Sequence, residues 1–205
     1  VITENNKILD DNDYKYLAEI QIHNIDLTLA KGDKVWGTQL SGGENYNNSW
    51  LQSIKLPNGV EILDSEAFRN CTSLNSVYLP NTLETIKDGA FLNCWCLGSI
   101  NFPNTLKTIG SSAFAQCDSL RDIVIPDSVE HIGSYAFSCS GYLGDIVIPD
   151  SVEQIEPYAF SACVIDNLKL AENRCIMTDA FEGGVIKNLI IPSSMLDFIY
   201  NNFNM

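Results

Sequence analysis

Hydrophobic and polar positions recur along most of the chain with a period of 23 residues. Three columns keep this register over five successive copies: a leucine, a proline and an Ala-Phe pair. The leucines are Leu51, Leu74, Leu97, Leu120 and Leu143; the prolines are Pro57, Pro80, Pro103, Pro126 and Pro149; the pairs begin at Ala67, Ala90, Ala113, Ala136 and Ala159. Self-similarity at a fixed period predicts a repeat architecture, in which stacked copies bury one shared core.

Each copy opens with a short segment that alternates apolar and polar side chains. In residues 120–126, Ile123 and Ile125 fall on one face and Asp122 and Val124 on the other, which predicts a short strand. The proline that follows has no backbone N–H and marks the end of the strand. Parallel stacking of such copies predicts a strand ladder along one face of the molecule.

The second half of each copy predicts how the coil closes. Val129 and Ile132 point inward, either in one turn of tight helix or in a second short extended segment. Ala136 and Phe137 then close the coil, with the alanine where two backbones crowd and the phenylalanine as the bulky filler of the core.

The period divides the chain into three parts. Residues 51–192 are the repeats, of which the last copies are degenerate. Residues 1–50 are read as an irregular, strand-rich N-terminal cap, with a loop over 41–49, because the first coil of a solenoid needs its apolar side covered. Residues 193–205 are read as a C-terminal cap, a short helix with Leu196, Ile199 and Phe203 on one face.

Most of the seven cysteines follow the period. Their column holds Cys71, Cys94, Cys117 and Cys163, and Ser140 occupies the slot between the last two. Side chains stacked in parallel do not converge as a disulfide requires, so we expect buried free thiols. Cys139 and Cys175 lie off the column, and Cys139 is expected to be exposed or paired. The short Cys94-Trp-Cys96 spacing does not suit a zinc site, and no metal or other cofactor is predicted.

The consensus L-x-x-I-x-I-P-x-x-V-x-x-I-x-x-x-A-F-x-x-C, written most fully by residues 143–163, resembles the BspA-like class of leucine-rich repeats. The commoner classes carry asparagine where this consensus carries proline. The resemblance implies a right-handed horseshoe or shallow arc, with the parallel strand ladder on its concave face and short helical or extended segments on its convex side. It also implies a secreted or surface protein of bacteria or parasitic protists that attaches to host matrix proteins, epithelial cells or other microbes. The family motif supplies no catalytic residues.

Charge and the remaining motifs restrict the function further. The net charge of −14 disfavours nucleic acid and anionic membranes as partners. No run of 18 apolar residues is present, so no membrane insertion is expected. His131 is read as a solvated surface residue, and Asp122 and Asp145, although stacked, are expected on a flat ladder without a cleft. Asp10 to Asp13 lacks the further ligands of a calcium loop.

The outward positions of the strand ladder are therefore the predicted binding surface. They hold the seven candidate residues Tyr78, Asn101, Asp122, Val124, Asp145, Val147 and Lys169. Exposed apolar side chains among polar ones are typical of a binding patch, and β-propensity explains the valines equally well. We expect a non-catalytic extracellular module that binds a host or microbial surface protein or glycan. There are two alternatives. One is a structural spacer, and the other is a hydrolase, which is disfavoured because the sequence shows no catalytic constellation.

The chain begins at Val1. This start is read as a mature or trimmed chain whose export signal has been removed, and the expected location is secreted or on the cell surface.

Overall fold

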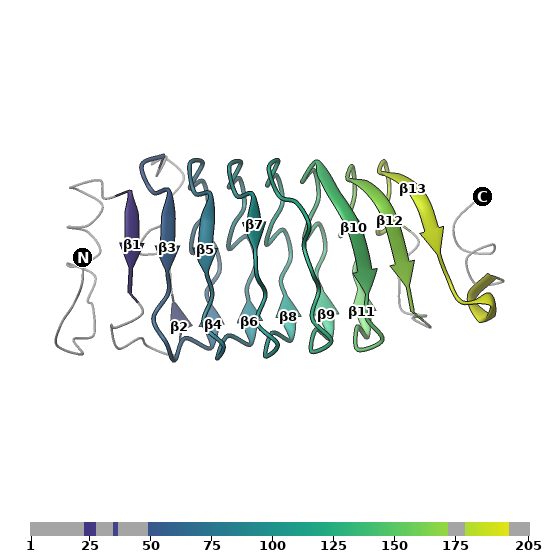
Figure 1. The fold of residues 1–205 in the computed structure, drawn as a ribbon, viewed down its shortest axis with the longest axis horizontal. Helices are drawn as coiled ribbons and strands as arrows, with labels where there is room; N and C mark the ends of the chain where they lie inside the picture. The colour runs from purple at the N-terminus through teal and green to yellow at the C-terminus, as the bar shows by residue number, and fades with distance from the viewer. Residues whose placement is uncertain (1–22, 28–34, 37–48, 172–178, 197–205) are drawn as a thin grey trace.

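The computed structural model describes residues 23–27, 35–36, 49–171 and 179–196. These residues form a solenoid of short coils that stand side by side along the longest axis of the molecule (Figure 1). The fold predicted from the repeat, a leucine-rich-repeat stack built on parallel strand ladders, is confirmed.

One face of the solenoid, which we call the strand face, carries the first strand of each coil. Two parallel ladders form it: the first contains β1 (Asn24–Asp26), β3 (Ser53–Lys55), β5 (Ser76–Tyr78) and β7 (Ser99–Ile100), and the other contains β10 (Tyr142–Ile148), β12 (Val164–Leu170) and β13 (Val185–Ile190). Partners in β3, β5 and β7 lie one repeat apart, as Ser53, Ser76 and Ser99 show. The outward side chains of these strands therefore form straight columns along the strand face.

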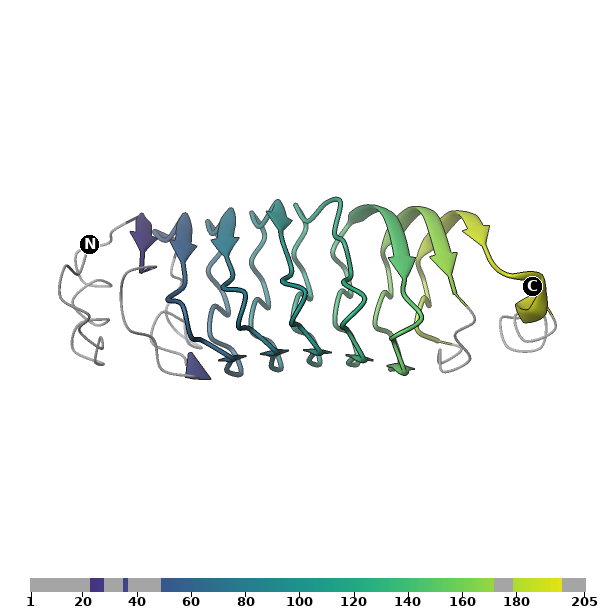
Figure 2. The same ribbon diagram turned by 60° about the horizontal axis from the view of Figure 1, so that its bottom comes forward.

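A further parallel ladder runs along another side of the coils (Figure 2). It contains β2 (Val35–Trp36), β4 (Ile62–Leu63), β6 (Thr85–Ile86), β8 (Thr108–Ile109), β9 (His131–Ile132) and β11 (Gln154–Ile155). The inward-pointing segment around Ile132 is therefore extended, which decides between the two alternatives that the sequence left open. In the described part of the chain the one helical element is the 3-10 turn η1 (Ser193–Met195).

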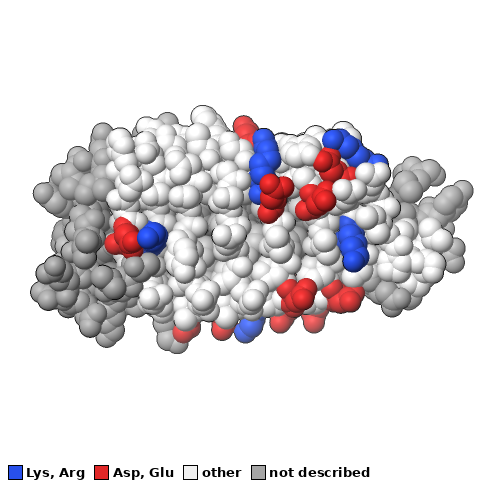
Figure 3. Space-filling view, viewed as in Figure 1, with Lys and Arg blue, Asp and Glu red and all other residues white. Residues whose placement is uncertain are grey.

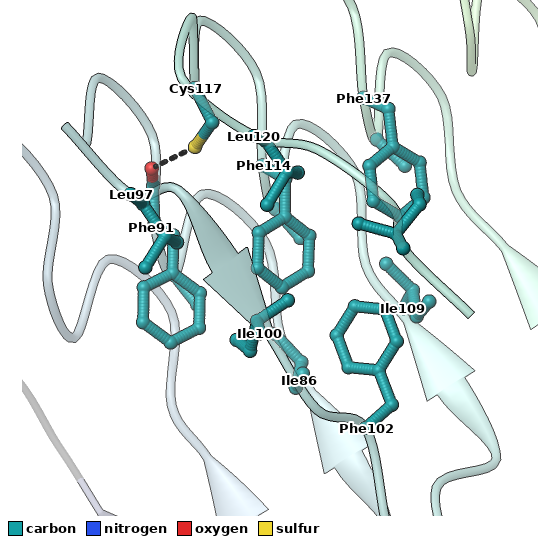
Figure 4. Packing of buried hydrophobic residues seen from close by; sticks show 14 of the residues in the cluster. Ile86, Phe91, Leu97, Ile100, Phe102, Ile109, Phe114, Cys117, Leu120 and Phe137 are labelled. Atoms are coloured by element: carbon teal, nitrogen blue, oxygen red, sulfur yellow. Dashed lines mark hydrogen bonds between the residues drawn. The ribbon is translucent and has the colours of Figure 1, made fainter. Parts of the chain in front are cut away.

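Phenylalanines stacked along the solenoid axis fill the core. Phe91, Phe114 and Phe137 have no exposed surface, and the centroid of the Phe114 ring lies 5.0 Å and 5.3 Å from those of its neighbours (Figure 4). Phe102 packs edge-on against Phe114 at 5.4 Å. The stack also includes Phe68, Phe160 and Phe181. Aromatic pairs in such arrangements contribute about 0.5–1.5 kcal/mol beyond the burial of their area.

The alanine that precedes each phenylalanine connects neighbouring coils. The backbone N–H of Phe91 donates to the carbonyl of Ala113, and that of Phe114 donates to the carbonyl of Ala136, both at 2.7 Å. These alanines are fully buried. A small residue is needed where two backbones approach this closely, which confirms the predicted role of the Ala-Phe pair.

The cysteine column is buried and its thiols are free. The Cys117 thiol donates to the Phe91 carbonyl at 3.3 Å (Figure 4). The hydroxyl of Ser140 makes the same bond to the Phe114 carbonyl at 2.6 Å, which explains why serine can occupy the column. Off the column, Cys139 is exposed and free, whereas Cys175 lies outside the described residues.

Every regular coil turns through left-handed backbone at two corners. The first corner holds Glu66 (φ 59°), Gly89 (φ 62°), Ser112 (φ 53°), Tyr135 (φ 58°) and Tyr158 (φ 62°); the second holds Asn70, Asn93, Gln116, Cys139 and Ala162, with φ between 54° and 63°. Bonds between coils hold the first corner, as when the Ser112 N–H donates to the Ser134 carbonyl at 2.8 Å. Residues other than glycine are strained in this conformation by roughly 1–2 kcal/mol each, and the stack sustains that strain.

The strand predicted for residues 120–126 is not formed, and that prediction is wrong. Within the described range 49–171, β7 is followed on the strand face by β10, and Asp122 between them adopts a left-handed φ of 51°. The side chains nevertheless alternate as predicted, with Ile123 and Ile125 buried and Val124 exposed.

The Arg121 side chain and Gly144 lie at this break in the ladder. The Arg121 guanidinium donates to the carbonyl oxygens of Asp118, Leu120 and Tyr142, at 3.0, 2.8 and 3.0 Å. The guanidinium thus links backbone segments of two neighbouring coils next to Asp122. Gly144 in the next coil has a φ of 71°, and a Cβ built there would lie 3.0 Å from the Asp122 carboxylate.

The ends of the chain are described in part. From residues 1–50, β1 and β2 each add a strand to a ladder, and Ile25 and Leu27 are buried in the core. Asn24 pairs with Ser53 at a separation of 29 residues, six more than the regular 23. The rest of the predicted strand-rich cap, including most of the 41–49 loop, lies outside the described residues.

At the C-terminal end, the described chain closes with η1. Met195 is buried, whereas Leu196, one of the three residues assigned to the apolar face of a capping helix, is exposed. Ile199 and Phe203 lie outside the described residues.

Candidate binding face

The seven predicted binding residues are all exposed on the strand face. They belong to two outward columns that run along the solenoid. One column holds Ser53, Ser76, Ser99, Asp122, Asp145, Asn167 and Asn188; the other holds Lys55, Tyr78, Asn101, Val124, Val147, Lys169 and Ile190. We call these the polar column and the mixed column.

At each end of the polar column, side chains of neighbouring coils are hydrogen-bonded to one another. Ser53 Oγ donates to Asn24 Oδ1 at 2.6 Å. Asn167 Nδ2 donates to Asp145 Oδ1 at 2.6 Å, and Asn188 Nδ2 donates to Asn167 Oδ1 at 3.0 Å. These groups hold neighbouring coils together and are already satisfied, so they are poor recognition groups.

The mixed column exposes large apolar side chains. Val124 is 74% exposed, Tyr78 55%, Val147 52% and Ile190 49%. Tyr78 and Val147 lie on strands β5 and β10 between buried inward residues, and Val124 lies between the buried Ile123 and Ile125. Apolar groups so placed favour association, because contact with a partner removes them from water.

A hollow of about 130 Å³ lies beside Tyr78. It is lined by Val77, Tyr78, Leu79, Asn81, Asn101, Phe102 and Pro103. Two of the predicted binding residues, Tyr78 and Asn101, therefore share one concavity. Sequence reasoning missed Asn81 and Phe102 as parts of it, because no pattern along the chain reveals where side chains of adjacent coils leave space.

A charged cluster, also missed from the sequence, forms at the start of β10, β12 and β13. Tyr142 Oη donates to the Asp166 carboxylate, and Lys187 Nζ lies 2.6 Å from the same carboxylate. Lys187 and Arg121 both stand over the Tyr142 ring, at 5.4 and 5.7 Å from its centroid. The Lys187 ammonium, followed by the Tyr142 hydroxyl, lowers the pKa of Asp166 below its usual value. The cluster joins three successive coils.

Charge divides the strand face into two halves. Charged groups gather over β10 to β13, whereas the surface over β5 and β7 is uncharged (Figure 3). The nearest charge on the N-terminal side, Lys55, is paired with Asp26 at 2.8 Å. The hollow beside Tyr78 therefore lies in the neutral half.

The second ladder carries its own hollow, of about 210 Å³, where Gly110 and Gly133 lack side chains. His131 lines it and is exposed, as predicted. Its carboxylates are engaged in the stack: Asp88 accepts from the Ser111 N–H at 2.8 Å, and Glu156 accepts from the Ser134 N–H at 3.0 Å. The two carboxylates that line this hollow together with His131 therefore bond neighbouring coils to one another.

The described part of the chain holds no group of three or more His, Cys, Asp or Glu side chains arranged to bind a metal ion. No helix among the same residues is long and apolar enough to cross a bilayer.

Comparison with known proteins identifies the repeat. The sequence profile described as "BspA type Leucine rich repeat region (6 copies)" matches residues 42–166 and 97–205. A leucine-rich repeat protein from Bacteroides ovatus superposes with a TM-score of 0.53 at 28% identity, over 72% of this chain and 39% of that one. The T. pallidum leucine-rich repeat protein superposes with a TM-score of 0.55 at 24% identity, over 82% and 76%, which supports the shared fold. No curated protein matches the chain.

Proposed function

Because the chain belongs to the BspA-type leucine-rich repeat family, which is associated with bacterial surface proteins, we propose that it is a non-catalytic recognition module of the cell exterior. It binds a surface protein or a glycan through its strand face. Function in solenoids generally resides on such an extended surface, which coils build together and no single coil possesses.

One observation supports this proposal above the others: the mixed column exposes Tyr78, Val124 and Val147 along one face. Aromatic side chains are enriched among the residues that dominate binding energy, and Tyr78 is half exposed. Beside Val147, bonds between Asp145, Asn167 and Asn188 of the polar column hold neighbouring coils in register. A surface held in this way loses little conformational freedom on binding, which lowers the entropic cost of association.

A binding screen tests the proposal. The purified chain is screened against matrix proteins, mucins and a glycan array, in parallel with the triple variant Tyr78→Ala, Val124→Asp, Val147→Asp. A matched control, Trp95→Ala, His131→Asp, Gln154→Asp, also removes one exposed aromatic and adds two acids, but leaves the mixed column intact. Thermal unfolding checks that both variants are folded.

We expect saturable binding by the parent chain and the control, and its loss in the strand-face variant. Binding that survives in the strand-face variant would place the site elsewhere on the molecule. An absence of saturable partners for the parent chain would favour the alternative function, a structural spacer.

A further inference from the structure

The walls of the hollow beside Tyr78 combine an aromatic ring with two amides. The Tyr78 ring is half exposed on β5, and Asn81 and Asn101 are exposed on the coils that flank the hollow. Phe102, almost fully buried, and Pro103 supply apolar surface between them. An aromatic ring offers an apolar plane, and each amide offers two donor hydrogens and one acceptor oxygen.

The two amides differ from those elsewhere on the strand face because they are available to a ligand. Asn167 and Asn188 are bonded to side chains of neighbouring coils. In contrast, within the described residues neither Asn81 nor Asn101 makes a side-chain hydrogen bond. Solvent satisfies them in the free protein, and a ligand with hydroxyl groups can replace that solvent one bond for another.

This combination of side chains occurs at one place along the described repeats. One coil further on, Val124 stands in the column of Asn101 and Asn104 in the column of Asn81, while Asn101 replaces the Tyr78 ring. Two coils further on, Val147 and Asp127 stand in the columns of Asn101 and Asn81, and Val124 in that of Tyr78. An aromatic ring between neutral amides is therefore confined to the coils of β5 and β7.

The charge around the hollow selects neutral ligands. The strand face over β5 and β7 is uncharged (Figure 3), and Lys55 next to it is neutralised by Asp26. The whole chain carries a net charge of −14, which repels anions approaching from any direction. Neither a basic site for an acidic ligand nor an acidic site for a basic one is present among these residues.

We propose that the hollow between Tyr78 and Asn101 binds one ring of a neutral glycan. The apolar face of the sugar stacks on Tyr78, and its hydroxyl groups exchange hydrogen bonds with Asn81 and Asn101. This inference rests on the proposed function and names the ligand class for that surface.

The size of the hollow limits the contact to a single sugar. Its volume of about 130 Å³ is below the ~300–1,000 Å³ of pockets that enclose whole drug-sized ligands. One ring in a shallow site binds weakly, so useful affinity requires several sugars on one surface, whose linked binding events reinforce one another. The ligand is accordingly a terminal or branch sugar of a densely presented glycan.

Two measurements with defined probes test the inference. The first is an array of neutral oligosaccharides, built from hexoses and N-acetylhexosamines, beside sialylated, sulfated and uronic-acid oligosaccharides. The second is a titration of the ¹⁵N-labelled chain with the methyl glycosides of glucose, galactose, mannose and N-acetylglucosamine. Both are repeated with Tyr78→Ala, Tyr78→Phe, Asn101→Ala and the control Trp95→Ala.

We expect neutral glycans to bind and anionic ones not to, with amide shifts centred on Tyr78, Asn81 and Asn101. Tyr78→Ala should weaken binding on the order of tenfold, since the stacked ring contributes about as much as an aromatic pair. Tyr78→Phe keeps the ring and should bind within about threefold of the parent, a change of ~0.6 kcal/mol. Asn101→Ala should weaken binding, and Trp95→Ala, which removes an exposed aromatic ring outside the mixed column, should leave it unchanged.

Other outcomes overturn the inference in distinguishable ways. Glycan binding that Tyr78→Ala leaves intact, or a preference for anionic glycans, would exclude this hollow as the site. A protein partner that the parent chain binds and the triple variant Tyr78→Ala, Val124→Asp, Val147→Asp loses, with no glycan bound, would exclude the glycan and leave the proposed recognition function standing. No binding to any probe or protein would remove both.

Discussion

At the scale of single residues, buried polar atoms in the core are satisfied by bonds that repeat from coil to coil. Cys94, Cys117 and Cys163 each donate to the carbonyl of a phenylalanine one coil earlier, and Ser140 does so with a hydroxyl. Burial raises the pKa of the Cys117 thiol and raises that of Cys163 to about 11. These thiols are therefore protonated and enclosed at physiological pH, which makes them poor nucleophiles.

Thiol labelling tests this arrangement. With iodoacetamide at pH 8 in the native state, we expect modification of the exposed Cys96 and Cys139, and none of Cys94, Cys117 or Cys163 until the chain is denatured. Peptide mass mapping assigns each site. Modification of Cys117 in the folded chain at a rate comparable to Cys139 would contradict its burial.

Two glycines of one column provide a second test at this scale. Gly144 has a φ of 71° and its built Cβ lies 3.0 Å from Asp122 Oδ1, whereas at Gly98 the nearest atoms are 4.0 Å away and φ is not left-handed. Gly144→Ala should lower the free energy of unfolding by about 1–2 kcal/mol. Gly98→Ala should be neutral or stabilising by up to about 1 kcal/mol, because it restricts the unfolded chain. Urea denaturation measures both, and equal effects would contradict the distorted backbone at β10.

At the scale of elements, each coil depends on its neighbours through the phenylalanine stack and the Ala-Phe hydrogen bonds. Phe114 contacts stacked rings on both sides and the edge of Phe102, whereas Phe181 stacks on Phe160 and is slightly exposed. An interior coil is therefore held from two directions.

Phe114→Ala should lower the free energy of unfolding by about 3–5 kcal/mol, the usual cost of truncating a buried phenylalanine. Phe181→Ala serves as the matched variant and should cost less, because its ring retains 8% exposure and lies near the end of the described stack, against Phe160. Denaturant titration of both gives the comparison. A loss below about 1 kcal/mol for Phe114→Ala would contradict the buried stack.

The elements also show what the sequence can predict. The period gives the strand columns, the Phe stack and the free thiols, because each depends on a contact repeated every 23 residues. The break at Asp122 could not be predicted, because residues 120–126 keep the apolar alternation while the Arg121 side chain takes backbone acceptors. Similarly, the first described coil could not be predicted from the 23-residue period, because Asn24 and its partner Ser53 are 29 residues apart.

The same limit applies to the candidate binding face. Exposure of Tyr78, Val124 and Val147 follows from alternation alone and was predicted. The hollow that joins Tyr78 to Asn81 and Phe102 was not, because it depends on how side chains of two coils pack beside each other. Binding by these residues stays a prediction.

At the scale of the whole molecule, contacts are confined to neighbouring coils, so stability should vary along the axis. The last described strand, β13, is paired with β12, and its inward residues Ile186 and Leu189 are only partly buried. The central strands β8 and β9 contribute the fully buried Ile109 and Ile132 to the core.

Native-state amide hydrogen exchange should reveal this gradient. We expect amides of β13 to exchange at least about tenfold faster than the hydrogen-bonded amides of β8 and β9, since local opening at an end disrupts fewer contacts. Uniform protection along the solenoid would show instead that the stack opens only as one unit.

The left-handed corners have a consequence for how such a protein can change over generations. One corner position holds glutamate, glycine, serine and two tyrosines at nearly the same φ, because bonds from the adjoining coil fix the backbone whatever the residue. A point mutation there alters what the surface offers to its surroundings and leaves the interior untouched. The non-glycine residues found there all lack branching at Cβ, so exchanging one such residue for another adds little new strain. The corners are thus sites where a lineage can acquire new surface chemistry while it retains the fold.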